Sequence, residues 1–148
     1  MEYTFREYRD IDFQFVYELK EKCFKWYIEK IYGWDSKIQI ELTKKEVNEN
    51  LFNMNIIQQA GKDIGLLTFY YDDIGDARIG MFAILPKFQG KGIGTQILRN
   101  ILEDNADIRI YLKTYKENPA RHLYRKVGFK KYDETDTHWL MKRQNLIY

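Results

Sequence analysis

The stretch from Ala77 to Leu102 constrains the fold more than any other part of the sequence. It begins with an apolar run of strand length, Ala77–Leu85, which stops at Pro86. It ends with apolar residues at the spacing of one helical face, which are Ile93, Ile97, Leu98, Ile101 and Leu102. The stretch therefore predicts a strand that turns directly into an amphipathic helix.

Three glycines lie in this turn, and they predict an anion-binding site. Gly90, Gly92 and Gly94 precede or open the helix, where backbone N–H groups lack intrahelical partners and the helix dipole is positive. Glycines also let a phosphate approach the backbone closely, and Lys91 adds a cation. The alternative is an ordinary strand-to-helix connection, in which three glycines would carry an unnecessary entropic cost.

Two common nucleotide-binding motifs do not fit the turn. Walker A requires Ser or Thr directly after its Lys, and here Gly92 follows Lys91. In the dinucleotide-binding motif Gly-x-Gly-x-x-Gly, the third glycine comes one residue later than Gly94 does. We therefore expect a different phosphate-containing ligand.

Two segments resemble motifs of the GNAT N-acetyltransferases. Gln89-x-x-Gly92-x-Gly94 is similar to motif A, Gln/Arg-x-x-Gly-x-Gly/Ala, which cradles the pyrophosphate of acetyl-coenzyme A in that family. Residues 118–129, from Asn118 to Phe129, resemble the family's Asn-x-x-Ala-x-x-Leu-Tyr-x-x-x-Gly-Phe. The alanine, Ala120, stands one position earlier than in some variants of this motif.

The resemblance implies acetyl-CoA as the cofactor and implies the residues that bind it. Backbone groups of the turn would contact the pyrophosphate, and the preceding strand would pair with the pantetheine arm. The implied cofactor-binding residues are Phe82, Ala83, Ile84, Gln89, Gly90, Lys91, Gly92, Ile93, Gly94, Thr95, Asn118 and Tyr124. Asn118 also suits a plain helix cap. No metal site is predicted.

Tyr124 is the predicted catalytic residue. The resemblance places its hydroxyl near the thioester sulfur, where a phenol can donate a proton to the leaving thiolate. The structural alternative is a core tyrosine on an amphipathic helix.

No single residue is predicted as the general base. An alkyl ammonium, with a pKa of about 10.4, must lose a proton before it attacks. Some relatives use a glutamate at the position that Arg78 occupies here. Asp76, Glu29 and His138 are the remaining candidates, together with a chain of waters.

The resemblance places part of the acceptor site where aromatic residues crowd one segment of this chain. The acceptor-site candidates are Trp26, Tyr27, Glu29, Trp34 and, near the other end of the chain, His138. Aromatic walls suit a cation or an apolar amine, and an oligomer interface explains them equally well. Cys23 is interpreted as a small core residue rather than a nucleophile, because its pattern contains no basic partner.

Composition indicates a folded domain without a general affinity for polyanions. The chain has 148 residues, 45% of them hydrophobic, and a net charge of only +2, which argues against nucleic acid or membrane binding. A single cysteine suits a reducing compartment, and we expect a cytoplasmic monomer or homodimer. Residues 1–148 are predicted to form one GNAT domain.

Periodicity and turn signals predict an α+β fold with about seven strands, and the resemblance implies that they form a mixed, mostly antiparallel sheet. Strands are expected at 3–8, 54–59, 64–71, 77–85, 108–115, 129–132 and 138–142. Helices are expected from Asp10 or Asp12 to Tyr32, over 36–50 with a possible break near Leu42, from Ile93, and after Asn118 with Pro119 at the first helical position. This order resembles the GNAT fold, in which two neighbouring strands splay apart to admit CoA.

The predicted activity is transfer of acetyl from acetyl-CoA to a primary amine by direct attack in a ternary complex. The peptide or small-molecule acceptor is not identified by the sequence. The alternatives are a non-catalytic module that binds or senses CoA, for which Arg78 is the only indication, and an interaction protein that uses the aromatic residues between Trp26 and Trp34.

Overall fold

The computed structural model describes residues 2–143, which form two compact units. The first unit contains the chain up to Phe69 together with Met81–Gln89, and the second contains Tyr70–Gly80 and the chain from Gly90 onward. The chain passes between the units within strand β3 (Lys62–Tyr71), within strand β4 (Ala77–Ile84), and again between Gln89 and Gly90. A single domain over residues 1–148 stays a prediction.

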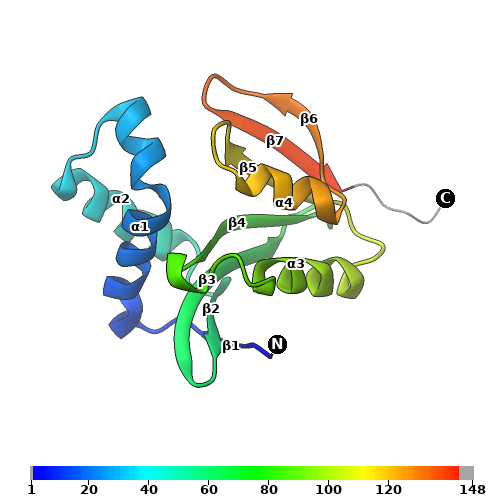
Figure 1. The fold of residues 1–148 in the computed structure, drawn as a ribbon, viewed down its shortest axis with the longest axis horizontal. Helices are drawn as coiled ribbons and strands as arrows, with labels where there is room; N and C mark the ends of the chain where they lie inside the picture. The colour runs from blue at the N-terminus through cyan, green and yellow to red at the C-terminus, as the bar shows by residue number, and fades with distance from the viewer. Residues whose placement is uncertain (1, 144–148) are drawn as a thin grey trace. The chain divides into compact units, whose positions relative to one another are not determined.

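Seven strands are hydrogen-bonded in the order β1-β2-β3-β4-β5-β7-β6, which confirms the predicted α+β class (Figure 1). The remaining strands are β1 (Thr4–Glu7), β2 (Met54–Gln59), β5 (Ile110–Tyr115), β6 (Lys130–Glu134) and β7 (His138–Arg143). β4 and β5 are parallel, whereas β1–β2, β2–β3, β5–β7 and β6–β7 are antiparallel. Between residues 2 and 143, no helix combines the length and hydropathy that a bilayer span requires.

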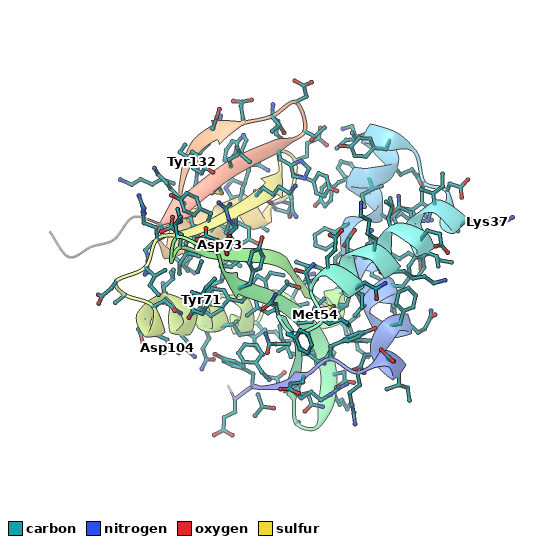
Figure 2. All side chains as sticks on the ribbon, turned by 180° about the vertical axis from the view of Figure 1, so that it is seen from behind. Lys37, Met54, Tyr71, Asp73, Asp104 and Tyr132 are labelled. Atoms are coloured by element: carbon teal, nitrogen blue, oxygen red, sulfur yellow. The ribbon has the colours of Figure 1, made fainter. Side chains whose placement is uncertain are left out.

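The first unit packs helix α1 (Phe13–Tyr32) and helix α2 (Ser36–Glu49) against its strands. Its core consists of Val16, Leu19, Val47, Met54, Ile56, Leu66, Ala83 and Leu85, and Figure 2 labels Met54 at the start of β2. Helix α1 buries one apolar face against this core. Val16 and Leu19 are buried, and Phe13 and Cys23 are half-buried against the same core.

Helix α2 is continuous, so the predicted break near Leu42 is wrong. Just beyond this point, the side chains of Thr43 and Glu46 accept hydrogen bonds from the buried Lys20 on α1, at 3.3 and 2.9 Å. The helix instead begins at Asp35, whose carboxylate accepts the N–H of Lys37 and of Ile38. Lys37 itself points outward from the helix (Figure 2).

Asp12 precedes α1 as predicted, but its carboxylate does not bind the N–H groups of that helix. It accepts two hydrogen bonds from Arg6, both at 2.8 Å, and one from the N–H of Arg9. Arg6 also donates to Asp63 at the start of β3. These contacts lower the pKa of both carboxyl groups and fix β1 to the rest of the first unit.

The second unit contains helix α3 (Ile93–Asp104) and helix α4 (Ala120–Val127). The predicted apolar face of α3 is buried, at Ile93, Ile97, Leu98, Ile101 and Leu102. Its C-terminal end is capped by the buried guanidinium of Arg143, which donates to the carbonyls of Leu102, Asn105 and Ile108. Helix-end carbonyls thus take the place of a carboxylate partner for this cation.

Candidate functional site

The glycine turn leaves the start of α3 without a side-chain cap. In the second unit, Gly90 and Gly92 adopt φ values of +76° and +87°, which favour glycine over any other residue. Gly92 is the N-cap of α3, and the first helical hydrogen bond runs from the N–H of Gln96 to its carbonyl at 3.1 Å. The N–H groups of Ile93, Gly94 and Thr95 therefore have no intrahelical acceptor, as an anion site requires.

In the first unit, the end of β4 is held by its neighbours. The Gln89 side-chain amide donates to the carbonyl of Ile84 at 2.8 Å, and the N–H of Leu85 donates to the carbonyl of Ile64 at 2.8 Å. Ala83 and Ile84 are buried and Phe82 is half-buried. The predicted pantetheine-binding residues thus lie on a well-ordered strand end.

In the second unit, the parallel ladder between β4 and β5 is short. Within the described chain it pairs Ala77 with Ile110 and Arg78 with Tyr111. Two parallel strands that splay apart are expected to pair only at their starts, as β4 and β5 do.

The second motif places its asparagine and tyrosine on either side of the start of α4. The Asn118 side-chain oxygen accepts the N–H of Ala120 at 2.9 Å. Pro119, predicted at the first helical position, is instead the N-cap, so the helix begins one residue later than expected. Asn118 therefore caps the first N–H of the helix from outside the N-cap position.

Tyr124 is buried in the second unit, and its ring packs edge-on against Phe129 with 5.9 Å between centroids. Burial raises the pKa of its phenol well above the usual value, so the hydroxyl is protonated at neutral pH. No residue between 2 and 143 is seen to hydrogen-bond this hydroxyl. The chemistry available to it is proton or hydrogen-bond donation.

The base candidates have different surroundings. Asp76 is buried and its carboxylate accepts a hydrogen bond from Arg109 at 3.2 Å, which occupies one of its oxygens. His138 stacks on Tyr115 at 4.3 Å, and its Nδ1 lies 2.7 Å from the Thr137 hydroxyl. Burial, with a smaller contribution from Lys113, lowers the pKa of His138. Its imidazole is therefore neutral at pH 7 and able to accept a proton.

Arg78 stands where relatives carry a glutamate, and its side chain makes other contacts. The guanidinium lies 5.0 Å from the centre of the Tyr111 ring and 3.5 Å from a carboxylate oxygen of Asp72. This position therefore supplies a cation rather than a base.

The aromatic acceptor-site candidates form two separate contacts in the first unit. Trp26, 62% exposed, meets Tyr27 edge-on at 5.1 Å, whereas Trp34 packs against Tyr17 at 6.3 Å. Glu29 lies on the same helix, and its carbonyl accepts the N–H of Gly33.

Two lysines that the sequence analysis did not single out lie over these indoles. The Lys30 ammonium is 5.0 Å from the Trp26 ring centre, and the Lys25 ammonium is 5.6 Å from that of Trp34. The i, i+4 spacing of Trp26 and Lys30 would have predicted the first contact. The chain itself thus provides a cation for each indole.

Comparison with known proteins identifies the family. The model of the acetyltransferase (GNAT) domain matches residues 50–131, which is more than half of the chain. The chain belongs to the GNAT acetyltransferase family. This membership confirms the predicted resemblance and the prediction of an acyltransferase of that family. No curated protein sequence matches the chain.

Solved structures show the same fold as this GNAT protein. The PaiA N-acetyltransferase from Thermoplasma acidophilum, in complex with coenzyme A, is 17% identical with a TM-score of 0.72, covering 97% of this chain and 99% of its own. An acetyltransferase from Thermus thermophilus is 15% identical with a TM-score of 0.74, covering 97% of both chains. The spermidine N-acetyltransferase from Vibrio cholerae, in complex with CoA and spermine, is 20% identical with a TM-score of 0.68, covering 97% and 95%.

Proposed function

We propose that this GNAT protein transfers an acetyl group from acetyl-CoA to a primary amine, by direct attack in a ternary complex. The observation that carries the proposal is the start of α3, where a glycine N-cap leaves three N–H groups available to an anion. Two structural relatives are complexes with coenzyme A, which supports CoA as the source of that anion.

Each unit contributes its own cofactor contacts to the proposal. In the first unit, Phe82, Ala83 and Ile84 pair with the pantetheine arm, and the backbone of Gln89 contacts the pyrophosphate. In the second unit, the turn from Gly90 to Thr95 binds the pyrophosphate, and Asn118 and Tyr124 complete the set. Acetyl-CoA supplies the activated thioester.

The proposed mechanism accounts for the proton that the amine loses and for the proton that the thiolate gains. The amine nitrogen attacks the thioester carbonyl carbon, and N–H groups near Phe82–Ile84 stabilise the negative charge that develops on its oxygen. The carbon–sulfur bond then breaks, and the Tyr124 hydroxyl donates its proton to the thiolate. Asp76, Glu29, His138 and a chain of waters are the candidate acceptors of the amine proton, and His138 is neutral at pH 7.

The acceptor is proposed only as a primary amine of a small molecule or peptide. Two of the structural relatives are spermidine N-acetyltransferases, which supports an amine of this kind without identifying it. Trp26, Tyr27, Glu29, Trp34 and His138 remain the proposed acceptor-site residues. The single thiol is compatible with a cytoplasmic monomer or homodimer.

Thermal denaturation with acetyl-CoA tests the cofactor first, with S-acetylpantetheine as the matched ligand that lacks the pyrophosphate. A ligand at a hundred times its Kd stabilises by about 2.7 kcal/mol, or about 5–10 °C for a chain of this size. We expect such a shift with acetyl-CoA and a much smaller one with S-acetylpantetheine. If millimolar acetyl-CoA produces no thermal shift, like S-acetylpantetheine, the proposal is contradicted.

A panel of amines, followed by release of free thiol from acetyl-CoA, then tests the transfer. Turnover with at least one amine supports the enzyme. Binding without turnover across the panel would instead favour a CoA-binding or sensing module, the alternative that Arg78 suggests.

A further inference from the structure

Two side chains from different elements of the first unit converge on the carbonyl of Ile84. The Cys23 thiol on α1 donates to this oxygen at 3.3 Å, and the Gln89 amide donates to it at 2.8 Å. A carbonyl oxygen has two lone pairs, so both are occupied. The peptide bond that follows is also held on its other side, because the N–H of Leu85 donates to Ile64.

The same strand end lies unusually close to β3. A Cβ added at Gly65 would clash with the carbonyl oxygen of Ala83 and lie 3.2 Å from the Cα of Ile84. Only glycine permits this approach. The last peptides of β4 are therefore fixed by backbone contact on one edge and by two side chains on the other.

The occupied carbonyl lies on the edge of β4 that faces away from β3. In a strand, the N–H and C=O of one residue point to the same edge, and those of the next residue point to the opposite edge. The carbonyl of Ala83 and the N–H of Leu85 are turned toward β3, so the N–H and C=O of Ile84 share the other edge. A bare carbonyl there would repel an oxyanion that approaches the Ile84 N–H.

We propose that Cys23 and Gln89 are positioning residues for acetyl transfer, which saturate the Ile84 carbonyl so that this edge presents its N–H donors to the thioester oxygen. The inference rests on the proposed function, because it requires the thioester to lie along Phe82–Ile84. It assigns Cys23 a role as a hydrogen-bond donor instead of a nucleophile.

The state of the thiol agrees with that role. Burial raises the pKa of Cys23 to about 11, so it carries its proton at neutral pH. Cys23 is also half-buried against the core of the first unit, which limits the rotation of its side chain.

Steady-state kinetics of Cys23 variants test the proposal. Cys23→Ser keeps a donor, whereas Cys23→Ala and Cys23→Val remove it with different volumes. We expect kcat to fall about tenfold in the Ala and Val variants, less than when an oxyanion donor itself is removed, with KM for acetyl-CoA within about twofold of the original. The Ser variant should retain kcat within about threefold of the original.

A second variant separates the hydrogen bond from core packing. Val16→Ala removes volume from the same core without touching Ile84, and it should lower thermal stability while leaving kcat unchanged. Gln89→Met removes the other donor, and its effect should be non-additive with Cys23→Val because both act on one oxygen.

The outcomes distinguish this inference from the proposed function. Wild-type kcat in Cys23→Val, or a Ser variant as slow as the Ala variant, would overturn the positioning role while leaving acetyl transfer intact. A wild-type protein that neither binds acetyl-CoA nor releases thiol would overturn the proposed function, and the inference with it.

Discussion

The two motifs that resemble those of the family act through different chemical groups, one through the backbone and the other through side chains. In the first motif, the turn from Gly90 to Thr95 acts through its backbone, because Gly90 and Gly92 supply left-handed φ values and leave N–H groups open. The segment from Asn118 to Phe129 acts through side chains, because Asn118 caps a helix and Tyr124 carries a protonated phenol. The glycine turn should therefore control cofactor affinity, and Tyr124 should control turnover.

Removal of the Tyr124 hydroxyl is expected to have the largest effect. Tyr124→Phe keeps the ring contact with Phe129 but cannot protonate the thiolate, so we expect kcat to fall about a hundredfold. The thermal shift with CoA should be unchanged. Turnover equal to that of the original protein would remove Tyr124 from the catalytic role and weaken the contrast between the motifs.

A pair of glycine variants tests the backbone motif. Gly90 and Gly61 share a φ of +76°, and a Cβ at either position meets no atom within 4 Å. Gly90→Ala and Gly61→Ala should therefore lose similar stability, about 1–2 kcal/mol each. Only Gly90→Ala should also weaken CoA binding, by about tenfold in a titration, because its Cβ would occupy space that the pyrophosphate needs. Equal CoA affinity of the two variants would contradict a pyrophosphate site at this turn.

Alkaline pH separates the buried phenol from the other tyrosines. The folded-state pKa of Tyr124 is raised, so its contribution to stability is complete below about pH 10 and is lost as the pH rises further, when only the unfolded chain ionises. Urea unfolding between pH 9 and 11 should give a steeper loss for the original protein than for Tyr124→Phe, by up to about 1.4 kcal/mol per pH unit. Identical slopes would mean that the phenol is solvated.

The smallest expected effect is that of removing the Asn118 cap of α4 on the free energy of unfolding. Asn118→Ala removes the acceptor for the Ala120 N–H and should cost about 1 kcal/mol in the free energy of unfolding. Asn118→Asp keeps an acceptor oxygen and serves as the control, so its stability should stay close to that of the original protein. If both variants keep full stability but lose CoA affinity, the asparagine belongs to the cofactor site and the cap is unimportant.

The elements were largely predictable from sequence, and the errors lie where tertiary contacts override local signals. The strand–turn–helix from Ala77 agrees with the structure because local periodicity and turn chemistry specify it. The predicted break in α2 failed because Thr43 binds a lysine from another helix. The strand at 108–115 begins at Ile110 instead, and the strand at 129–132 covers Lys130–Glu134.

The candidate site was predictable only in part. The sequence named the backbone motif and Tyr124, but it could not show that Cys23 bonds to Ile84, 61 positions away. Nor could it show that Lys25 lies over Trp34, whereas the i, i+4 spacing of Trp26 and Lys30 does predict their contact.

By itself, the sequence determined the glycine turn, the amphipathic helices and the two motifs, because φ requirements and apolar spacing are properties of a few neighbouring residues. Only the tertiary structure decided which groups saturate the Ile84 carbonyl and which carbonyls receive the Arg143 guanidinium. Cys23 and Arg143 are distant in sequence from the carbonyls they bind, and a hydrogen bond depends on where packing places both atoms, which no local pattern encodes.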